Sequence, residues 1–118
     1  MISGVYKITC IRNNKVYVGQ SLDINRRLNQ HFNALNSLTH SHHSKAFQED
    51  WDKYGCDAFI AEIVEQVPPS KLEEREKYWI DFYKSDTEGY NVRGEYYKAI
   101  KDEIDSVIEK LNNLKEKL

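Results

Sequence analysis

Two short segments that face each other across a pair of asparagines constrain the fold of this chain more than any other feature. Residues 4–11 and 15–20 are rich in Val, Ile, Thr and Tyr, which favour strands. Asn13 and Asn14 lie between them and tolerate the left-handed backbone of a tight turn. The sequence therefore predicts an antiparallel hairpin at the start of the chain.

Side chains along a strand alternate between its two faces, and this alternation sorts the residues of the hairpin. Tyr6 shares a face with Ile8 and Cys10, and Tyr17 shares one with Gly19. Because tyrosine suits a half-buried sheet, packing alone would account for either ring. Gly19 removes a side chain from the second strand, although a plain turn glycine would look the same in the sequence.

The chain up to residue 95 continues with helix and strand signals in turn. We expect a helix over 24–37 capped by Asp23, a helix through Phe47 and Trp51 that ends at Gly55, a strand over 58–65, and a helix from a Ser70-Glu73 capping box to about Lys84. These elements predict one α+β domain over residues 1–95. Its three-stranded antiparallel sheet is flanked by helices in the order β-β-α-α-β-α.

The last part of the chain has a different pattern. From Tyr97 to Leu118, apolar residues recur at alternating spacings of three and four, with charges between them. This pattern predicts an amphipathic helix over residues 96–118. Its apolar stripe needs a cover, so we expect it to dock on its own domain, to pair with a second chain in a homodimer, or to serve as a linker.

Charge gives a mixed indication about nucleic-acid partners. The formal net charge is -2, whereas affinity for phosphate usually comes from an excess of Lys and Arg. The charges are unevenly distributed along the chain. Residues 1–57 carry seven basic and five acidic side chains, whereas residues 58–96 carry five basic and nine acidic ones. We therefore expect the N-terminal half to face phosphate, with modest affinity for DNA.

Other bulk features exclude several classes of protein. No apolar run approaches the ~20 residues of a membrane helix, and the start at Met1 has no signal-peptide pattern, so we expect a cytoplasmic protein that does not enter membranes. Cys10 and Cys56 lack the spacing of metal ligands and suggest no disulfide framework. We interpret both as plain thiols.

Glu76 is the strongest physical indication of chemistry. On a helix over residues 70–84 it lies on the same side as Leu72, Trp79 and Tyr83, which places a carboxylate within the apolar stripe. An unpaired buried charge costs several kcal/mol, so it should meet a cation, a metal ion or hydrogen-bond donors. The two interpretations are an ion pair with Arg27 and a metal ligand.

Arg27 and His31 lie one turn apart on the first predicted helix and project from the same side. His31 falls inside the apolar arc, Arg27 at its border, and Arg26 on the opposite face. Taken alone, His31 fits a hydrogen-bonded core histidine as well as a catalytic one. Arg27 alone fits a surface or ion-paired residue.

Taken together and in order, these motifs resemble the GIY-YIG nuclease family, in particular the catalytic domain of phage group I intron homing endonucleases. The matching residues are Gly4-Val5-Tyr6, Tyr17-Val18-Gly19, Arg27, His31, Glu76 and Gly89-Tyr90-Asn91. The resemblance covers about the first 95 residues. It implies a metal-dependent enzyme that hydrolyses phosphodiester bonds in DNA.

The resemblance also assigns roles. Glu76 would bind Mg²⁺, with Mn²⁺ as a substitute, and Arg27 would bind the scissile phosphate. Tyr6, Tyr17 and His31 would hold the attacking water and manage its proton, and either tyrosine could be the base. A phenol has a pKa near 10, so that role requires a nearby cation.

Three further residues complete the predicted site. Asn91 matches an asparagine that hydrogen-bonds around the active site, although it would cap a turn equally well. Gly19 and His40 are assigned to substrate binding. The loop histidines His40, His42 and His43 have no supporting Cys or acidic residue, so we expect a solvated loop rather than a metal cluster.

The homing enzymes carry a DNA-binding region after the catalytic domain, and this chain offers only the 96–118 segment in that place. The chain would then be a stand-alone nuclease, a repair or recombination subunit that takes its specificity from a protein partner, or a nuclease domain of a longer chain. The alternative function is a non-catalytic DNA-binding or scaffold module of the same fold. The presence of every catalytic-type residue favours the enzyme.

Overall fold

The computed structural model describes residues 1–38, 42–91 and 109–110. The expected site residue His40 lies outside these ranges. So does nearly all of the segment 96–118, together with the docking or dimerisation predicted for it. Within the described residues, no helix is long and apolar enough to cross a membrane.

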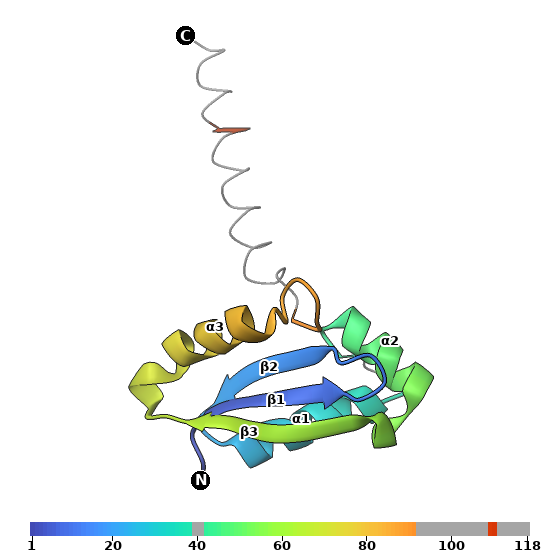
Figure 1. Ribbon diagram of the computed structural model, residues 1–118, viewed down its shortest axis with the longest axis horizontal. Coiled ribbons are helices and arrows are strands. Elements are labelled where there is room, and N and C mark those ends of the chain that lie inside the picture. Colours follow the sequence, from blue (N-terminus) through green and yellow to red (C-terminus); the bar gives the residue numbers. More distant parts are fainter. Residues whose placement is uncertain (39–41, 92–108, 111–118) are drawn as a thin grey trace.

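The sheet has the three antiparallel strands expected from the sequence. They are β1 (Gly4–Cys10), β2 (Val16–Ser21) and β3 (Phe59–Gln66). β1 lies in the middle, so the order across the sheet is β2-β1-β3 (Figure 1). Both neighbours of β1 run antiparallel to it, which confirms the predicted sheet and the α+β class.

The turn between β1 and β2 confirms the tight turn predicted from Asn13 and Asn14. Asn14 has a φ of 62°, in the left-handed region that asparagine tolerates. The Oδ1 of Asn13 accepts a hydrogen bond of 3.0 Å from the backbone N–H of Lys15. Together these two residues fix the register in which Tyr6 lies opposite Gly19.

The first two helices begin and end close to where the sequence places them. α1 spans Ile24–Asn36 and α2 spans Lys45–Tyr54. The side chain of Asp23 accepts from the backbone N–H of Arg26, so the predicted cap is confirmed. α2 ends at Gly55, whose φ of 82° suits a glycine.

The third helix corrects one prediction. α3 spans Leu72–Tyr83, and the capping box expected at Ser70 and Glu73 does not form. A short 3-10 turn, η2 (Pro69–Lys71), precedes the helix instead, and Lys71 occupies the cap position without a side-chain hydrogen bond. A second 3-10 turn, η1 (Cys56–Ala58), leads into β3.

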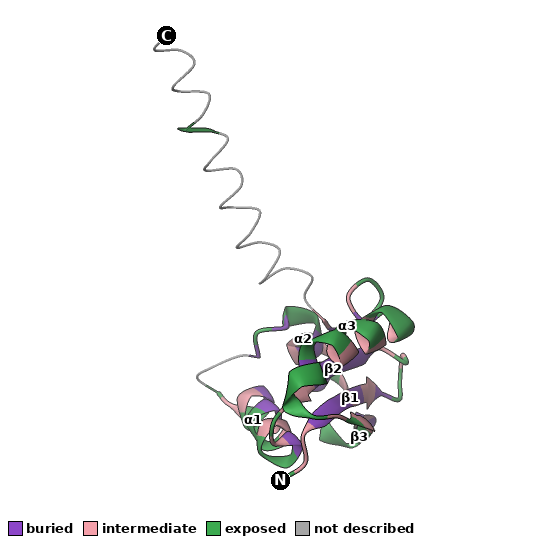
Figure 2. Cartoon of the chain, turned by 90° about the vertical axis from the view of Figure 1, so that its left-hand side faces the viewer, coloured by how far each residue is buried: buried purple, intermediate pink, exposed green. Residues whose placement is uncertain are grey.

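The sheet separates two layers of helices. Side chains on one face of the sheet pack against α1 and α2, and those on the other face pack against α3. Buried residues gather on β1 and β2, which the helices flank (Figures 1 and 2). The first cluster contains Tyr6, Ile8, Cys10, Tyr17, Ile24, Leu35, Phe47, Trp51, Ala58 and Tyr90. The second contains Val5, Val16 and Val18, with Val64, Trp79, Ile80 and Tyr83 packed against them. The alternation predicted for the hairpin is therefore confirmed.

Candidate active site

Tyr6 and Gly19 form the floor of the site. They are direct partners across β1 and β2, and the Tyr6 ring lies over the space that a side chain at Gly19 would occupy. A Cβ on Gly19 would be 2.5 Å from Cζ of Tyr6 and closer still to its oxygen. Gly19 is thus needed in mid-strand to seat the phenol, and it is not a turn glycine.

A chain of short hydrogen bonds runs from the Tyr6 phenol into the protein. The Tyr6 oxygen is 2.6 Å from Nε2 of His31, and Nδ1 of His31 is 2.7 Å from Nε2 of His42. All three side chains are buried. Burial and the neighbouring charges lower the pKa of His31 to about 3 and that of His42 to about 4, so both rings are neutral near pH 7.

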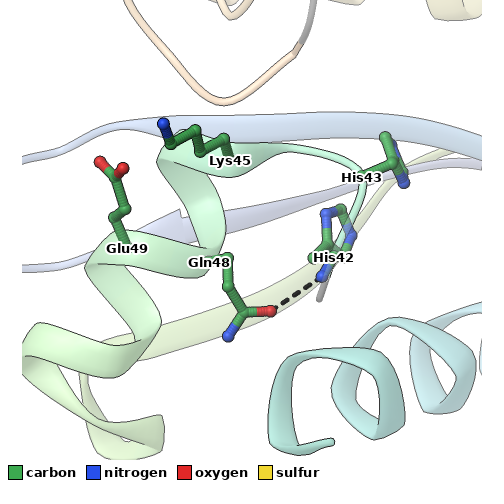
Figure 3. A pocket seen from close by; sticks show the side chains of 5 residues that line it. All are labelled: His42, His43, Lys45, Gln48 and Glu49. Carbon is green, nitrogen blue, oxygen red and sulfur yellow. Dashed lines mark hydrogen bonds between the residues drawn. The ribbon is translucent and has the colours of Figure 1, made fainter. Parts of the chain in front are cut away.

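His42 contradicts the expectation of a solvated loop. It is 5% exposed, and its backbone N–H donates to Oε1 of Gln48 at 2.9 Å (Figure 3). Its Nδ1 accepts from the backbone N–H of Ser44 at 3.0 Å. The burial of His42 could not be predicted from the sequence, because a loop has no periodic pattern of apolar residues. The available signal was Ser44, two residues later, which caps α2 and so fixes the end of the loop.

A pocket of about 540 Å³ opens beside this loop. It is lined by His42, His43, Lys45, Gln48 and Glu49 (Figure 3). His43 and Lys45 are exposed, so the pocket offers one cationic and one imidazole side chain next to the buried histidines.

Tyr17 occupies the same face of the sheet from β2. Its ring meets the ring of His31 edge to face, with centroids 4.9 Å apart, and its hydroxyl is 3.2 Å from Nε2 of His43. It is 7% exposed. The structure therefore brings both predicted tyrosines against His31.

Arg27 lies near the same phenol, on α1. Its guanidinium donates to Oε1 of Gln30 at 3.0 Å, and its charge acts on the pKa of Tyr6. Burial raises the pKa of Tyr6 far above its ordinary value, and the nearby charge of Tyr17 adds to this, whereas Arg27 opposes it. Arg27 is half-buried and Arg26 is exposed, as their positions on the helix predict.

Glu76 approaches from the opposite layer. It lies half-buried on α3, close enough to Gln20, the neighbour of Gly19, for the backbone of Gln20 to act on the pKa of its carboxyl group. Burial raises the pKa of Glu76, the backbone of Gln20 opposes this, and the charge of Glu73 adds to it. Its own charge raises the pKa of Tyr6, so the carboxylate lies within electrostatic reach of the phenol.

The described surroundings of Glu76 bear on the two interpretations of its carboxylate, an ion pair and a metal ligand. No ion pair joins it to Arg27 in the described part of the chain, so that interpretation does not hold. No group of three or more His, Cys, Asp or Glu converges as a metal centre among the described residues. A single carboxylate suits Mg²⁺, which keeps several water ligands and uses one or two carboxylates.

Asn91 holds β2 through hydrogen bonds to its backbone. Its Oδ1 accepts from the backbone N–H of Val18 and its Nδ2 donates to the Val18 carbonyl, both at 2.8 Å. The preceding Tyr90 donates its backbone N–H to the carbonyl of Val16 at 3.0 Å. Asn91 therefore fixes the strand between Tyr17 and Gly19, which makes it a positioning residue.

Comparison with known proteins identifies the family. Residues 2–91 match the model of the GIY-YIG catalytic domain. The chain therefore belongs to the GIY-YIG nuclease family, which confirms the resemblance in the sequence. The matched range ends at Asn91, the residue that holds β2.

Individual relatives agree with this assignment. Intron-associated endonuclease 1 of Enterobacteria phage T4 is 39% identical over 94 residues, which cover 78% of this chain and 37% of that protein. The chain thus spans little more than a third of that relative. A solved catalytic domain of homing endonuclease I-TevI superposes with a TM-score of 0.71 at 35% identity, over 78% of this chain and 99% of that one. A point mutant of the I-TevI catalytic domain gives 0.70 at 36% identity, over 78% and 94%.

Proposed function

We propose that residues 1–91 of this GIY-YIG family member form a metal-dependent endonuclease domain that hydrolyses phosphodiester bonds in DNA. One observation supports this above all others. The phenol oxygen of Tyr6 meets His31 within electrostatic reach of Arg27 and Glu76. The imidazole of His31 contacts the phenol that lies over Gly19, and the charges of Arg27 and Glu76 both act on the pKa of that phenol.

Each group has a part in attack of water on phosphorus. Arg27 binds the scissile phosphate and stabilises the charge that develops on it. The hydroxyls of Tyr6 and Tyr17 hold the attacking water and the phosphate, and one phenol takes the proton of the water. Because burial raises the pKa of Tyr6, that step depends on nearby positive charge, of which Arg27 supplies a part.

Glu76 would hold the metal ion, Mg²⁺ or Mn²⁺ in its place. When bound, the ion supplies positive charge for the leaving oxygen of the cut strand. The desolvated carboxylate, which forms no ion pair within the described residues, supports this role. With one carboxylate in the site, we propose a single metal ion rather than a two-metal centre.

Recognition of a DNA sequence would come from outside this domain. The net charge of -2 provides little general affinity for phosphate, so a protein partner, a second copy or further protein surface would have to add it. We place the activity in the cytoplasm. The rival function is a DNA-binding or scaffold module without catalysis.

Nicking of supercoiled plasmid separates the two functions. We expect cleavage with Mg²⁺ and none with EDTA, and we expect Arg27→Ala to slow it by about 10²-fold or more. Arg26→Ala, an exposed control on the same helix, should change it little. Wild-type protein that binds DNA without cutting it under any divalent ion would establish the scaffold function instead.

A further inference from the structure

The hydrogen bonds that link Ser44, His42, His31 and Tyr6 allow only one arrangement of protons. A backbone N–H can only donate, so the amide of Ser44 makes Nδ1 of His42 an acceptor. A neutral imidazole carries one proton, which must then sit on Nε2 of His42. That proton points at Nδ1 of His31, 2.7 Å away.

The same reasoning passes to the next ring. Nδ1 of His31 accepts from His42, so the proton of His31 sits on Nε2 and points at the Tyr6 oxygen, 2.6 Å away. The reverse direction fails, because His42 would have to accept at both nitrogens without carrying a proton. A cationic His31 also fails, because its Nδ1–H would meet the Nε2–H of His42.

We propose that the backbone amide of Ser44 sets the direction of this chain, so that His31 donates a hydrogen bond to the Tyr6 oxygen and cannot receive the proton of that phenol. His42 and Ser44 are then positioning residues. The low pKa values of both histidines agree with neutral rings. The tautomers follow from geometry alone, whereas their effect on catalysis rests on the proposed nuclease function.

The effect on Tyr6 is specific. Its oxygen receives a hydrogen bond from Nε2–H of His31, and the nearby charge of Arg27 also lowers its pKa. Donors to the oxygen favour the ionised phenol. The hydroxyl hydrogen of Tyr6, when present, points to an acceptor other than His31, such as water or a phosphate oxygen. A proton that Tyr6 takes up therefore leaves toward the substrate side.

Nuclear magnetic resonance of the full chain labelled with ¹⁵N tests the tautomers without any cleavage. We expect both rings to carry their proton on Nε2, with a coupling across the hydrogen bond from Nε2 of His42 to Nδ1 of His31. Single substitutions of the exposed His43 and of His40 remove the other histidine signals and assign the spectrum. A proton on Nδ1 of either ring at neutral pH would overturn the proposal.

Ser44→Ala is the matched control for the amide. It keeps the backbone N–H and loses the hydroxyl, which donates to the carbonyl of Tyr90 at 2.6 Å. We expect lower stability but unchanged tautomers. If the tautomers changed while the protein stayed folded, the side chain and not the amide would set the direction, and the proposal would be wrong.

Substitution of His31 tests the effect on catalysis. Glutamine can donate to Tyr6 and accept from His42, whereas glutamate can only accept. We expect His31→Gln to keep cleavage within about tenfold of wild type, and His31→Glu to lose about 10²-fold or more. His31→Met, neutral and without a donor, should be as slow as the glutamate variant, which separates the lost donor from the added charge.

A proton-accepting His31 would give the opposite order, with glutamate faster than glutamine, and that result would overturn the catalytic part. Thermal unfolding of each variant shows whether it is folded. Absence of cleavage by the wild-type protein would refute the nuclease function, and the spectra would still decide the direction of the hydrogen bonds.

Discussion

Gly19→Ala tests the placement of the phenol most directly. The new Cβ would lie 2.5 Å from Cζ of Tyr6, whereas carbon atoms in contact are normally about 3.5–4.0 Å apart. The ring must therefore retreat by about 1 Å, and it is already 2.6 Å from His31. We expect overpacking to cost about 1–3 kcal/mol of stability. For a domain of this size, each kcal/mol lowers Tm by about 4–8 °C.

The effect on cleavage should be larger than the effect on stability. A displacement of ~1 Å in a reacting group can cost about 10²-fold in rate. Single-turnover cleavage at saturating DNA isolates that step from binding. Gly55→Ala is the control, because a Cβ there meets nothing within 4 Å but strains a φ of 82°. It should lower Tm by a few degrees and leave the rate unchanged. A Gly19→Ala protein with wild-type Tm and rate would refute the seating of Tyr6 on Gly19.

Glu76→Gln should abolish metal-supported cleavage without lowering Tm, because the variant loses a desolvated carboxylate. The control Glu65→Gln breaks a 2.6 Å ion pair with Arg75, so it should lower Tm and leave cleavage unchanged. An active Glu76→Gln protein would contradict the metal assignment. The pKa values of His31 and His42 lie below the unfolded value of 6.5, so the unfolded chain binds more protons than the folded one at acidic pH. Urea denaturation should therefore show that the free energy of unfolding falls as the pH falls from about 6.5 to 4, by up to about 1.4 kcal/mol per pH unit for each ring. An equal loss in His31→Gln would count against this prediction. Asn91→Ala should lower the free energy of unfolding by about 1–3 kcal/mol and slow cleavage, because two hydrogen bonds to Val18 are lost. The control Thr87→Ala loses one exposed hydrogen bond to Lys84 and should change neither quantity. Equal effects of the two substitutions would contradict the positioning role of Asn91.

The sequence predicted those parts of the molecule that depend on local periodicity. The hairpin, the shared face of Tyr6 and Ile8, and the inward position of His31 all follow from spacing along one element. Glu76 also lies where the helix pattern puts it, although its side chain is only half-buried. Such positions need no knowledge of distant contacts.

Contacts between distant segments could not be predicted in this way. His42 is buried because its loop folds over His31 and is fixed by Ser44 and Gln48, and a run of polar residues gives no sign of that. The capping box at Ser70 failed because Pro69 starts a 3-10 turn, which moves the start of α3 to Leu72. Roles assigned to Arg27 and Glu76 came from the family resemblance and stay predictions until tested.

The hydrogen bonds made by Tyr90 and Asn91 decide how this sheet can associate. β2 is an edge strand, and an edge strand with free N–H and C=O groups invites pairing with another chain. The C=O of Val16 and both the N–H and the C=O of Val18 already make hydrogen bonds to Tyr90 and Asn91. These hydrogen bonds oppose the addition of a strand at Val16 and Val18, so the edge of β2 is protected at this point without a fourth strand.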